Sequence, residues 1–507
     1  MVSVVLAFIM AFLTALTVTP PVRVLARRLG ATDDPNKARK VHDRVIPRMG
    51  GLAIAAAFFF PLVILWGIET EVAKAFIADR KQIVILAFGG LMILALGVYD
   101  DRRGARASTK LAIQLPVAVL LVLSGFTFDA NVSFLGFDFG LGVLAPAVTI
   151  LWIVGITNAM NLIDGLDGLA AGISLLVVLT LFVLSLVNQH YVGAMLNACL
   201  AGALVGFLVH NFHPATIFMG DTGSLFIGYM IASIALLTSS KGTTTVAFLV
   251  PVIALSVPIM DTTLATFRRL LRNRSPFSAD QEHMHHKLLH LGFSHQRVVL
   301  IMWAFALATC LTALGVAFVR GTQVWSVLVI YSVVVFVVVK KMGFIRVDNW
   351  QGEFKAGRNL KQKRKKQSKS IEQMQNTFKF MEHPDQLPGL LLPLHQLLNY
   401  AAMQVQLSDS FLVTLGSTQG RYVWPGLDDP SIWSQGRSVT YPLEGRYGPI
   451  GEVTYVFLSE KAIDVEEEQL LDRVHQLMIE GLERIQRANS NIGLAGEEAK
   501  IRVLPSA

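Results

Sequence analysis

The stretch NAMNLIDGLDGLAAG covers residues 158–172 and lies between two long apolar runs, 139–157 and 169–187. An ionised carboxylate close to hydrocarbon is energetically expensive, so the first interpretation of such a residue is functional. The repeated Asp-Gly also predicts a helix end, because glycine terminates helices and lets the backbone approach a ligand closely. The polar side chains that need this explanation are Asn158, Asn161, Asp164 and Asp167.

The composition of the chain is that of a membrane protein. Of 507 residues, 53% are hydrophobic and 16% are charged, and the mean hydropathy is +0.52. Soluble domains are usually about 25% charged. Cys199 and Cys310 both lie inside apolar runs, which excludes a disulfide framework and a cysteine-built zinc site. The N-terminal apolar run lacks the positive flank of a secretory signal, so we expect a retained first helix.

Apolar runs recur from the first residues to about residue 340, and most are long enough for a membrane-spanning helix. We therefore predict an all-α polytopic membrane protein with about eleven transmembrane helices within residues 1–341. The runs are 2–19, 51–67, 83–99, 111–126, 139–157, 169–187, 191–209, 225–239, 244–261, 298–319 and 324–339.

The distribution of lysine and arginine predicts the orientation. These residues concentrate in 20–50, 100–110 and 264–297, whereas 127–142 contains neither. The positive-inside rule places the basic loops in the cytoplasm and the N-terminus outside. An odd number of helices then leaves the C-terminus in the cytoplasm.

The composition changes after about residue 342. We expect a basic linker or helix over 342–382, which contains KAGRNLKQKRKKQSKS, and a soluble cytoplasmic α+β domain over 383–507. A solvated linker is the favoured interpretation of the basic run, and a cluster beside anionic lipid is the next. The predicted elements of the soluble domain are the strands SFLVTL, RYVWP, SVTYPL and GEVTYVFL, followed by the helix VEEEQLLDRVHQLMIEGLERIQ.

Each predicted cytoplasmic connection of the membrane region carries an unusual polar motif. Their side chains should therefore gather at one membrane face and form a site that opens to the cytoplasm. The carboxylates of this set are Asp100, Asp101, Asp164, Asp167 and Asp221, and the histidines are His283, His285 and His286.

These residue types indicate phosphate chemistry. Hard carboxylate and amide oxygens without thiolates suit Mg²⁺, which binds through one or two carboxylates together with substrate phosphates. Mg²⁺ with lysine, arginine and histidine donors stabilises the charge that develops during phosphoryl transfer. A site between membrane and cytoplasm suggests one lipid substrate and one soluble substrate.

Each motif alone also has an ordinary explanation. Asp-Asp after a helix is usually a solvated cap, HMHH usually belongs to a surface helix, and GDTGS fits a loop turn and helix cap. Asn211 and His213 fit a role in satisfying backbone groups. The arrangement of all the motifs on alternate loops of one face favours a site over these separate explanations.

Five motifs in series resemble the polyprenyl-phosphate N-acetylhexosamine-1-phosphate transferases, over about residues 1–340. The resemblance is greatest to the branch that transfers GlcNAc-1-phosphate to undecaprenyl phosphate, and the fifth motif carries that distinction. The soluble tail departs from the short C-terminus of this family, and its pattern resembles a GAF-type regulatory domain. The motifs are DDPNKARKVHDRVIPRMGG, YDDRRG with Ser108 and Lys110, NAMNLIDGLDGLAAG, NFHPATIFMGDTGSLFIG and SPFSADQEHMHHKL.

The resemblance implies an enzyme of the bacterial cytoplasmic membrane that converts UDP-GlcNAc and undecaprenyl phosphate to undecaprenyl-pyrophosphoryl-GlcNAc and UMP. Its cofactor would be Mg²⁺, or Mn²⁺ in its place. Such a product initiates a lipid-linked surface glycan such as O-antigen. The resemblance leaves open whether the protein forms a homodimer. No nucleic-acid partner is expected. The ligand or partner of the C-terminal soluble domain is unknown.

The resemblance also implies roles for particular residues. Asp221 would be the principal metal ligand, with Asn161 or Asp100 nearby, and Asp100 or Asp101 would position or deprotonate the lipid phosphate. Nucleotide binding or pocket shape would depend on Asp164, Asp167 and Asn211, and Asn158 would join the substrate-binding set. The residues expected to neutralise the pyrophosphate are Lys110, His283, His285 and His286, and those expected at the mouth of the site are Lys40, His42, Arg44 and Arg48.

Three alternatives stay open at this point. The same chemistry could use another UDP-N-acetylhexosamine. A transporter would also hold carboxylates in a membrane, although it tends to place charge near the midplane and to show repeated halves. A non-catalytic scaffold would recruit partners through the region 345–507.

Overall fold

The chain divides into two compact units, Met1–Glu353 and Phe354–Ala507. The predicted domain boundaries at 341/342 and 382/383 stay predictions, because most of 342–366 lies outside the described residues. The computed structural model describes residues 2–33, 45–66, 71–128, 131–134, 137–140, 142–239, 245–271, 283–319, 323–341, 362, 365, 367–387, 389–391, 400–415, 420–424, 433, 437–446, 448–457 and 465–501.

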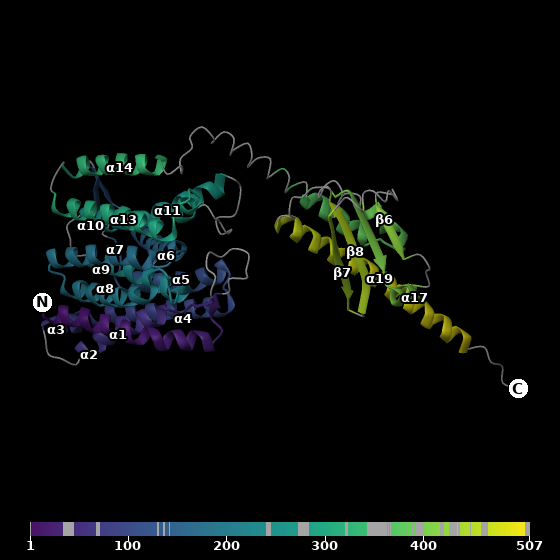
Figure 1. The fold of residues 1–507 in the computed structure, drawn as a ribbon, viewed down its shortest axis with the longest axis horizontal. Helices are drawn as coiled ribbons and strands as arrows, with labels where there is room; N and C mark the ends of the chain where they lie inside the picture. Colours follow the sequence, from purple (N-terminus) through teal and green to yellow (C-terminus); the bar gives the residue numbers. More distant parts are fainter. Residues whose placement is uncertain are drawn as a thin grey trace. The chain divides into compact units, whose positions relative to one another are not determined.

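Unit 1 is a bundle of helices (Figure 1), and its described residues also form two short hairpins. The hairpins pair β1 (Thr32–Asp33) with β2 (Ile46–Pro47) and β3 (Asn131–Phe134) with β4 (Phe137–Gly140). The helices are α1 (Val2–Arg28), α2 (Gly51–Trp66), α3 (Glu71–Ala78), α4 (Arg80–Arg103), α5 (Ala107–Leu123), η1 (Gly142–Leu144), α6 (Ala145–Ile163), α7 (Leu169–Val187), α8 (Tyr191–Asn211), α9 (Gly220–Ser239), α10 (Thr245–Ala254), α11 (Ser256–Leu271), α12 (Met284–His290), α13 (His295–Phe318) and α14 (Gln323–Lys341).

The prediction of a helical membrane protein is confirmed. Among the described residues, eight helices are long and apolar enough to cross a membrane, and the apolar helices α2 and α5 are shorter. The run 244–261, predicted as one span, is divided between α10 and α11. Pro258 lacks the N–H that would bond the carbonyl of Ala254 in a continuous helix, which accounts for the break. The number of eleven spans stays a prediction.

Helix α8 forms the centre of unit 1, and most of its side chains are buried. It packs against α1, α2 and α7, and Figure 1 shows α7, α8 and α9 between the layer of α1 and the layer of α13. Gly202 and Gly206 lie against the backbone of α1, where a Cβ atom would overlap the carbonyl groups of Phe8 and Phe12. Small residues four apart allow two membrane helices to approach closely. This packing fixes the end of α1 near the site described below.

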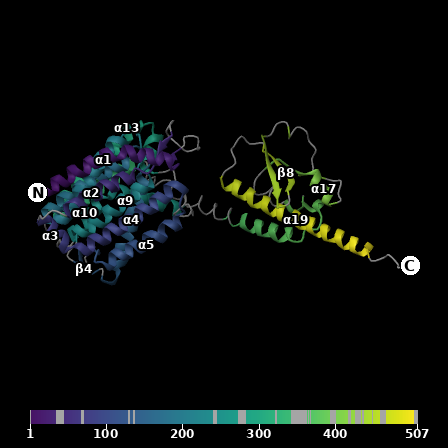
Figure 2. The same cartoon turned by 90° about the horizontal axis from the view of Figure 1, so that it is seen from below.

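Helices α4 and α5 lie side by side, as Figures 1 and 2 both show, and α4 also packs against α9. Gly97 on α4 faces the backbone of Thr222, and Gly51 at the start of α2 faces the backbone of Gly223. A Cβ atom at either glycine would overlap the first turn of α9. The three glycines therefore allow α2 and α4 to hold the start of α9, which carries Asp221.

Unit 2 contains a four-stranded antiparallel sheet with the order β6-β5-β8-β7. Figure 2 shows the long helix α19 along this sheet, and the hydroxyl of the buried Tyr455 on β8 lies in hydrogen-bond contact, at 3.0 Å, with His475 Nε2 on α19. The elements are η3 (Pro384–Gln386), β5 (Ala402–Leu407), α17 (Asp409–Leu415), β6 (Arg421–Trp424), β7 (Arg437–Gly445), β8 (Gly448–Phe457) and α19 (Val465–Ile501).

Three of the four predicted strands and the final helix of unit 2 are confirmed. The stretch SFLVTL is not a strand but helix α17. Its start is capped, because Ser408 Oγ accepts a hydrogen bond of 3.3 Å from the N–H of Phe411, an N-cap contact that favours a helix. The strand β5 was not among the predicted elements. The GAF-type assignment of this unit stays a prediction.

Candidate active site

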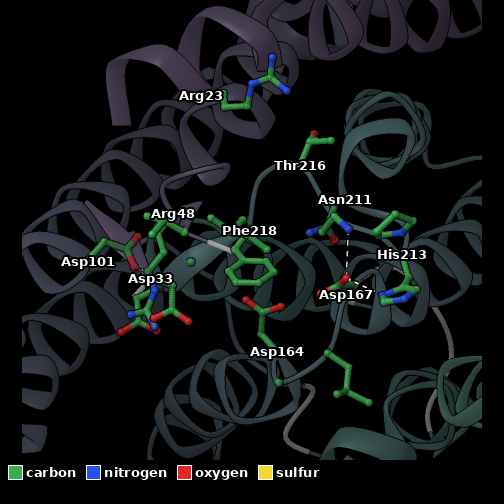
Figure 3. Close-up of a pocket in the computed structure, with 18 of the residues that line it drawn as sticks. Arg23, Asp33, Arg48, Asp101, Asp164, Asp167, Asn211, His213, Thr216 and Phe218 are labelled. Atoms are coloured by element: carbon green, nitrogen blue, oxygen red, sulfur yellow. Dashed lines mark hydrogen bonds and ion pairs between the residues drawn. The ribbon is translucent and has the colours of Figure 1, made fainter. Parts of the chain in front are cut away.

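A cavity of about 890 Å³ lies in unit 1, where the ends of several helices meet. Figure 3 shows Phe218 in the middle of the cavity wall, with Asp164 beside it and Arg23 on another side. The charged residues of the wall come from α1, β1, the β2–α2 connection, α4, the α6–α7 connection, the α8–α9 connection, α9, α12 and α13. They are Arg23, Arg27, Asp33, Arg48, Asp101, Asp164, Asp167, His213, Asp221, His286 and His295.

The stretch that opened the sequence analysis forms one side of this cavity. Helix α6 ends at Ile163 and α7 begins at Leu169, as the repeated Asp-Gly predicts. Gly168 has a φ of +74°, and its N–H donates a hydrogen bond of 3.1 Å to Asn211 Oδ1. The connection between α6 and α7 therefore presents both carboxylates, Asp164 and Asp167, to the cavity.

Asp221, in the first turn of α9, lies in a network of polar contacts. Lys110 Nζ on α5 lies 3.0 Å from Asp221 Oδ2 and also pairs with the carboxylate of Asp100. Asn161 Nδ2 on α6 donates to Asp221 Oδ1 at 2.5 Å and to Ser224 Oγ at 2.9 Å. Four helices thus bring together three residues predicted as metal ligands, Asp221, Asn161 and Asp100, with Lys110 between the two carboxylates.

Asp101 makes different contacts from Asp100. Its Oδ1 accepts a hydrogen bond of 3.0 Å from the N–H of Asp221, and its Oδ2 accepts from the N–H and the hydroxyl of Thr222, at 3.0 and 2.5 Å. These N–H groups have no partners within α9, because the first turn of a helix leaves its donors unsatisfied. Asp101 therefore caps α9 from α4, which fixes the position of Asp221.

The donor set around Asp221 fits a hard divalent cation. Asp100 and Asp221 supply carboxylate oxygens, Asn161 supplies an amide oxygen, and none of these ligands is a thiolate or an imidazole. Octahedral oxygen coordination is the preference of Mg²⁺. The Lys110 ammonium already lies between the two carboxylates, so this position attracts positive charge. The magnesium assignment itself stays a prediction.

Asp164 faces the cavity close to the other carboxylates. Burial is the main cause that raises the pKa of Asp164 to about 8, with a contribution from the negative charges of Asp221 and Asp101, whereas Arg48 opposes this shift. The carboxyl of Asp164 is therefore largely protonated at neutral pH when no cation is bound. A protonated carboxyl can donate a hydrogen bond to a substrate, which an ionised one cannot do.

We expect Asp164→Asn to flatten the pH dependence of stability. Between pH 4 and 8 the folded protein binds a proton at Asp164 that the unfolded chain has released, so stability decreases as pH rises through this range and levels off above pH 8. The variant lacks this titration. Thermal unfolding of the full chain in detergent without divalent cations, measured from pH 5 to 9, should show a smaller decrease for Asp164→Asn than for wild type. The control variant Asp79→Asn should show the same decrease as wild type. An equal decrease in wild type and Asp164→Asn would contradict the raised pKa of Asp164.

Asp167 belongs to a separate cluster with His213 and His295. Asp167 Oδ2 accepts hydrogen bonds from His213 Nδ1 at 2.8 Å and from the N–H of Ala215 at 3.0 Å. His295 Nε2 accepts a hydrogen bond of 3.0 Å from the N–H of Asp167, and the two imidazole rings stack with centroids 4.5 Å apart. One potential metal-ligand atom of each residue lies within 4.8 Å of the other two, a spacing that is compatible with a bound metal ion. Because His213 and the N–H of Ala215 bond to the carboxylate of Asp167, and His295 bonds to its backbone N–H, the contacts favour a role in shaping the α8–α9 connection.

The three histidines of the fifth motif have different environments. His283 Nδ1 lies 3.0 Å from Asp261 Oδ2, and only His286 of the three lines the cavity. His285 is buried against Gly165, and burial with the nearby His286 lowers the pKa of His285 to about 3. The ring of His285 is thus neutral at physiological pH. These contacts do not support the expected neutralisation of pyrophosphate by His283 and His285.

Of the remaining predicted residues, Asn211 lines the cavity, Asn158 does not, and three lie outside the described residues. Asn158 Nδ2 on α6 donates a hydrogen bond of 2.7 Å to Gln114 Oε1 on α5, and Gln114 Nε2 donates one of 3.4 Å to Asn158 Oδ1. Asn158 therefore links α6 to α5. Asn211 donates to the carbonyl of Ile217 at 3.0 Å and orders the α8–α9 connection. Lys40, His42 and Arg44 lie outside the described residues.

Sequence reasoning did not assign several residues of the cavity wall to the site. Arg23 and Arg27 were interpreted as signals of orientation, because basic residues at a helix end have that ordinary meaning. Phe218 and His295 stand in or next to apolar stretches, where an aromatic residue is usually part of the core. Asp33 pairs with Arg48. Asp33 belongs to the first motif, in which acidic and basic residues alternate, and this pattern was the one sequence feature that could have assigned Asp33 to the site.

Comparison with known proteins gives a consistent result. The model of glycosyl transferase family 4 matches residues 83–239. A probable undecaprenyl-phosphate N-acetylglucosaminyl 1-phosphate transferase of Bacillus subtilis is 41% identical over 339 residues, which cover 66% of this chain and 90% of that protein. A decaprenyl-phosphate N-acetylglucosaminephosphotransferase of Mycobacterium tuberculosis is 40% identical over 308 residues, 56% of this chain and 75% of the relative.

A more distant relative is the undecaprenyl-phosphate alpha-N-acetylglucosaminyl 1-phosphate transferase of Escherichia coli, 28% identical over 324 residues, 62% of this chain and 84% of the relative. These similarities and the polar cavity at the helix ends agree with the five motifs. The chain belongs to the polyprenyl-phosphate N-acetylhexosamine-1-phosphate transferase family.

Proposed function

We propose that the protein transfers GlcNAc-1-phosphate from UDP-GlcNAc to undecaprenyl phosphate, with Mg²⁺, and releases UMP. The relatives named above act on undecaprenyl or decaprenyl phosphate and GlcNAc, by their names. The observation that carries the proposal is the position of Asp221. Lys110 and Asn161 contact its carboxylate, and it lines the same cavity as Asp164 and Asp101.

In the reaction, an oxygen of the lipid phosphate attacks the phosphorus that carries the sugar. A P–O bond to the lipid forms, the P–O–P bond of the donor breaks, and UMP leaves with the electron pair. A phosphate monoester has a second pKa near 6, so the acceptor is largely dianionic at neutral pH. The approach of two anions is then the main barrier, and positive charge lowers it.

The residues of the chain have distinct roles in this proposal. Asp221 and Asp100 would hold Mg²⁺ with Asn161, and the ion would stabilise the charge that builds on the diphosphate. Lys110 supplies a second positive charge at the same place. Asp101 keeps α9 in position through its cap. The ring of Phe218 lines the cavity and offers a face on which a nucleobase can stack.

The positions of the carboxylates argue against the transporter alternative. Asp100 and Asp101 lie at the end of α4, Asp164 follows α6, and Asp221 lies in the first turn of α9. A transporter tends to bind its substrate near the membrane midplane, where broken helices meet. The helix-end position fits a site at the membrane surface, which we propose is the cytoplasmic surface of the bacterial inner membrane.

The test is UMP release by the purified full-length protein with undecaprenyl phosphate and Mg²⁺. UDP-GlcNAc, UDP-GalNAc and the MurNAc-pentapeptide nucleotide are compared as donors. We expect turnover with UDP-GlcNAc that EDTA abolishes and Mg²⁺ restores. Preference for another donor would correct the sugar, and folded protein without turnover on any donor would favour the scaffold alternative.

A further inference from the structure

The HMHH motif at 283–286 contains two histidines that the proposed function leaves without a role. His283 and His285 are both buried, and of the three histidines in the motif only His286 lines the cavity. The motif forms the start of α12, with His283 as the residue that precedes the helix. The contacts that fix the start of α12 therefore decide where the side chain of His286 lies.

Asp261 on α11 makes two of these contacts. Its Oδ1 accepts a hydrogen bond of 2.8 Å from the N–H of Met284, and its Oδ2 lies 3.0 Å from His283 Nδ1. Met284 is the first residue of α12, so its N–H has no partner within the helix. Because a carboxylate can only accept, it places a proton on His283 Nδ1. Asp261 thus binds both the backbone and a side chain at the start of α12.

Burial makes these contacts stronger constraints than a cap at the protein surface. Asp261 is 1% exposed and His283 is 5% exposed. Water does not reach such a position to replace a lost partner, so removal of the carboxylate would leave the donors of Met284 and His283 unsatisfied. Helix α11 in turn packs against α6, which ends next to Asp164 (Figure 1). Asp261 therefore ties α12 to the same framework that positions Asp164.

A series of ring contacts leads from Asp261 to the cavity. The rings of His283 and His285 are nearly parallel, with an interplanar angle of 7° and centroids 5.9 Å apart. The centroids of His285 and His286 are 4.3 Å apart. His285 also lies against Gly165, where a Cβ atom would overlap its imidazole. A displacement of α12 at Asp261 would therefore be passed through packed rings to His286.

We propose that Asp261 is a positioning residue, which holds the start of α12 through His283 and Met284 so that His286 faces the substrates in the cavity. Asp261 itself does not line the cavity. This inference rests on the proposed function, because the substrates in that cavity are those of the transferase. It deepens that function by giving the two buried histidines of the fifth motif a role in the position of the third.

A double-mutant cycle on the full-length protein tests this role through kcat/KM for UDP-GlcNAc, measured as UMP release. Asp261→Ala should lower kcat/KM by about 10-fold or more, because a small shift of a group that contacts the substrate costs much of the rate. Asp261→Asn keeps the side-chain volume and one acceptor, so it should give an intermediate value, and it replaces Asp261→Ala in the cycle if that protein does not fold.

The second side of the cycle removes His286. In a His286→Ala background, Asp261→Ala should change kcat/KM by less than about 2-fold, because the two substitutions remove the same contribution. The matched control is His290→Ala, at the exposed end of the same helix. His290→Ala should behave as wild type, and in its background Asp261→Ala should keep its full effect.

Two results would overturn the inference while the proposed function holds. One is a wild-type kcat/KM in the Asp261 variant or in His286→Ala. The other is a double variant whose loss equals the product of the two single losses, as expected if Asp261 only stabilises the fold.

A second arm measures the position of α12 without turnover. Diethyl pyrocarbonate modifies accessible imidazoles, and tandem mass spectrometry locates the label. In wild type we expect label on the exposed His290 and none on the buried His285. The Asp261 variant should lose the protection of His285, while His190, buried at the start of α8, stays protected because the fold is intact.

The labelling also separates the inference from the proposed function. If wild type has no turnover on any donor, the proposed function fails, and selective labelling of His285 in the Asp261 variant still supports the role of Asp261 in holding α12. Equal labelling of His285 in the two proteins, or loss of protection at His190 as well, overturns the inference.

Discussion

Replacing Asp221 with asparagine should lower kcat by about 10³-fold at every pH, because the main carboxylate of the proposed metal position is lost. Asp221 is the point where Lys110 and Asn161 converge, whereas Asp100 shares only the contact with Lys110. The substitution keeps the size of the side chain, and α9 should stay in place because Asp101 caps it through backbone N–H groups. UMP release at saturating substrates, from pH 6 to 9, measures this effect.

The matched control for this variant is Asp79→Asn, which removes a carboxylate at the opposite end of α4. It should retain the wild-type rate. A fully folded Asp221→Asn protein with a near-normal rate in Mg²⁺ would remove Asp221 from the reaction. Loss of activity that higher pH restores would instead indicate a proton-transfer role.

Replacing Asp101 should also reduce turnover strongly, but through position rather than charge. The asparagine of Asp101→Asn would turn an N–H₂ group toward the donors of Thr222, so the cap of α9 is weakened, at a cost of about 1–2 kcal/mol in unfolding free energy. A shift of about 1 Å in a catalytic group can cost about 10²-fold in rate. We therefore expect a decrease of about 10²-fold in kcat, with the shape of the pH profile unchanged.

A second variant separates the cap from a proton-transfer role for Asp101. Gly220 has a φ of +69°, and a Cβ atom there would lie 2.5 Å from Asp101 Oδ2. Gly220→Ala should thus disturb the same cap while the carboxylate remains. The two variants should have rates similar to each other, both below that of wild type. The shape of their pH profiles should match that of wild type. Loss of the acidic limb in Asp101→Asn alone would show that Asp101 accepts a proton.

Much of the site follows from the sequence, because a charge in an apolar chain needs a reason. Asp164, Asp167 and Asp221 stand at the ends of apolar runs, and the structure places all three at one cavity. The helix end at Asp164 also follows from the repeated Asp-Gly. These features depend on local sequence and on the strong cost of charge near hydrocarbon.

Features that depend on distant contacts could not be predicted. The pairing of Lys110 with Asp221 spans 111 residues, and the cap between Asp101 and α9 spans 120. The neutral state of His285 results from burial against Gly165, which the motif does not reveal. Arg23 has the sequence context of an orientation signal, and only the structure shows that it lines the cavity and that its buried Nε has no hydrogen-bond partner among the described residues.

Binding of Mn²⁺ as a paramagnetic substitute for Mg²⁺ tests the metal position most directly, because it does not depend on turnover. Electron paramagnetic resonance of the full-length protein with UMP present measures free and bound Mn²⁺. We predict one bound ion in wild type, binding at least about 10-fold weaker in Asp221→Asn, and unchanged binding in His213→Ala, which alters the separate Asp167 cluster. Equal affinity in wild type and Asp221→Asn, or loss of binding in His213→Ala alone, would contradict a cation held by Asp221.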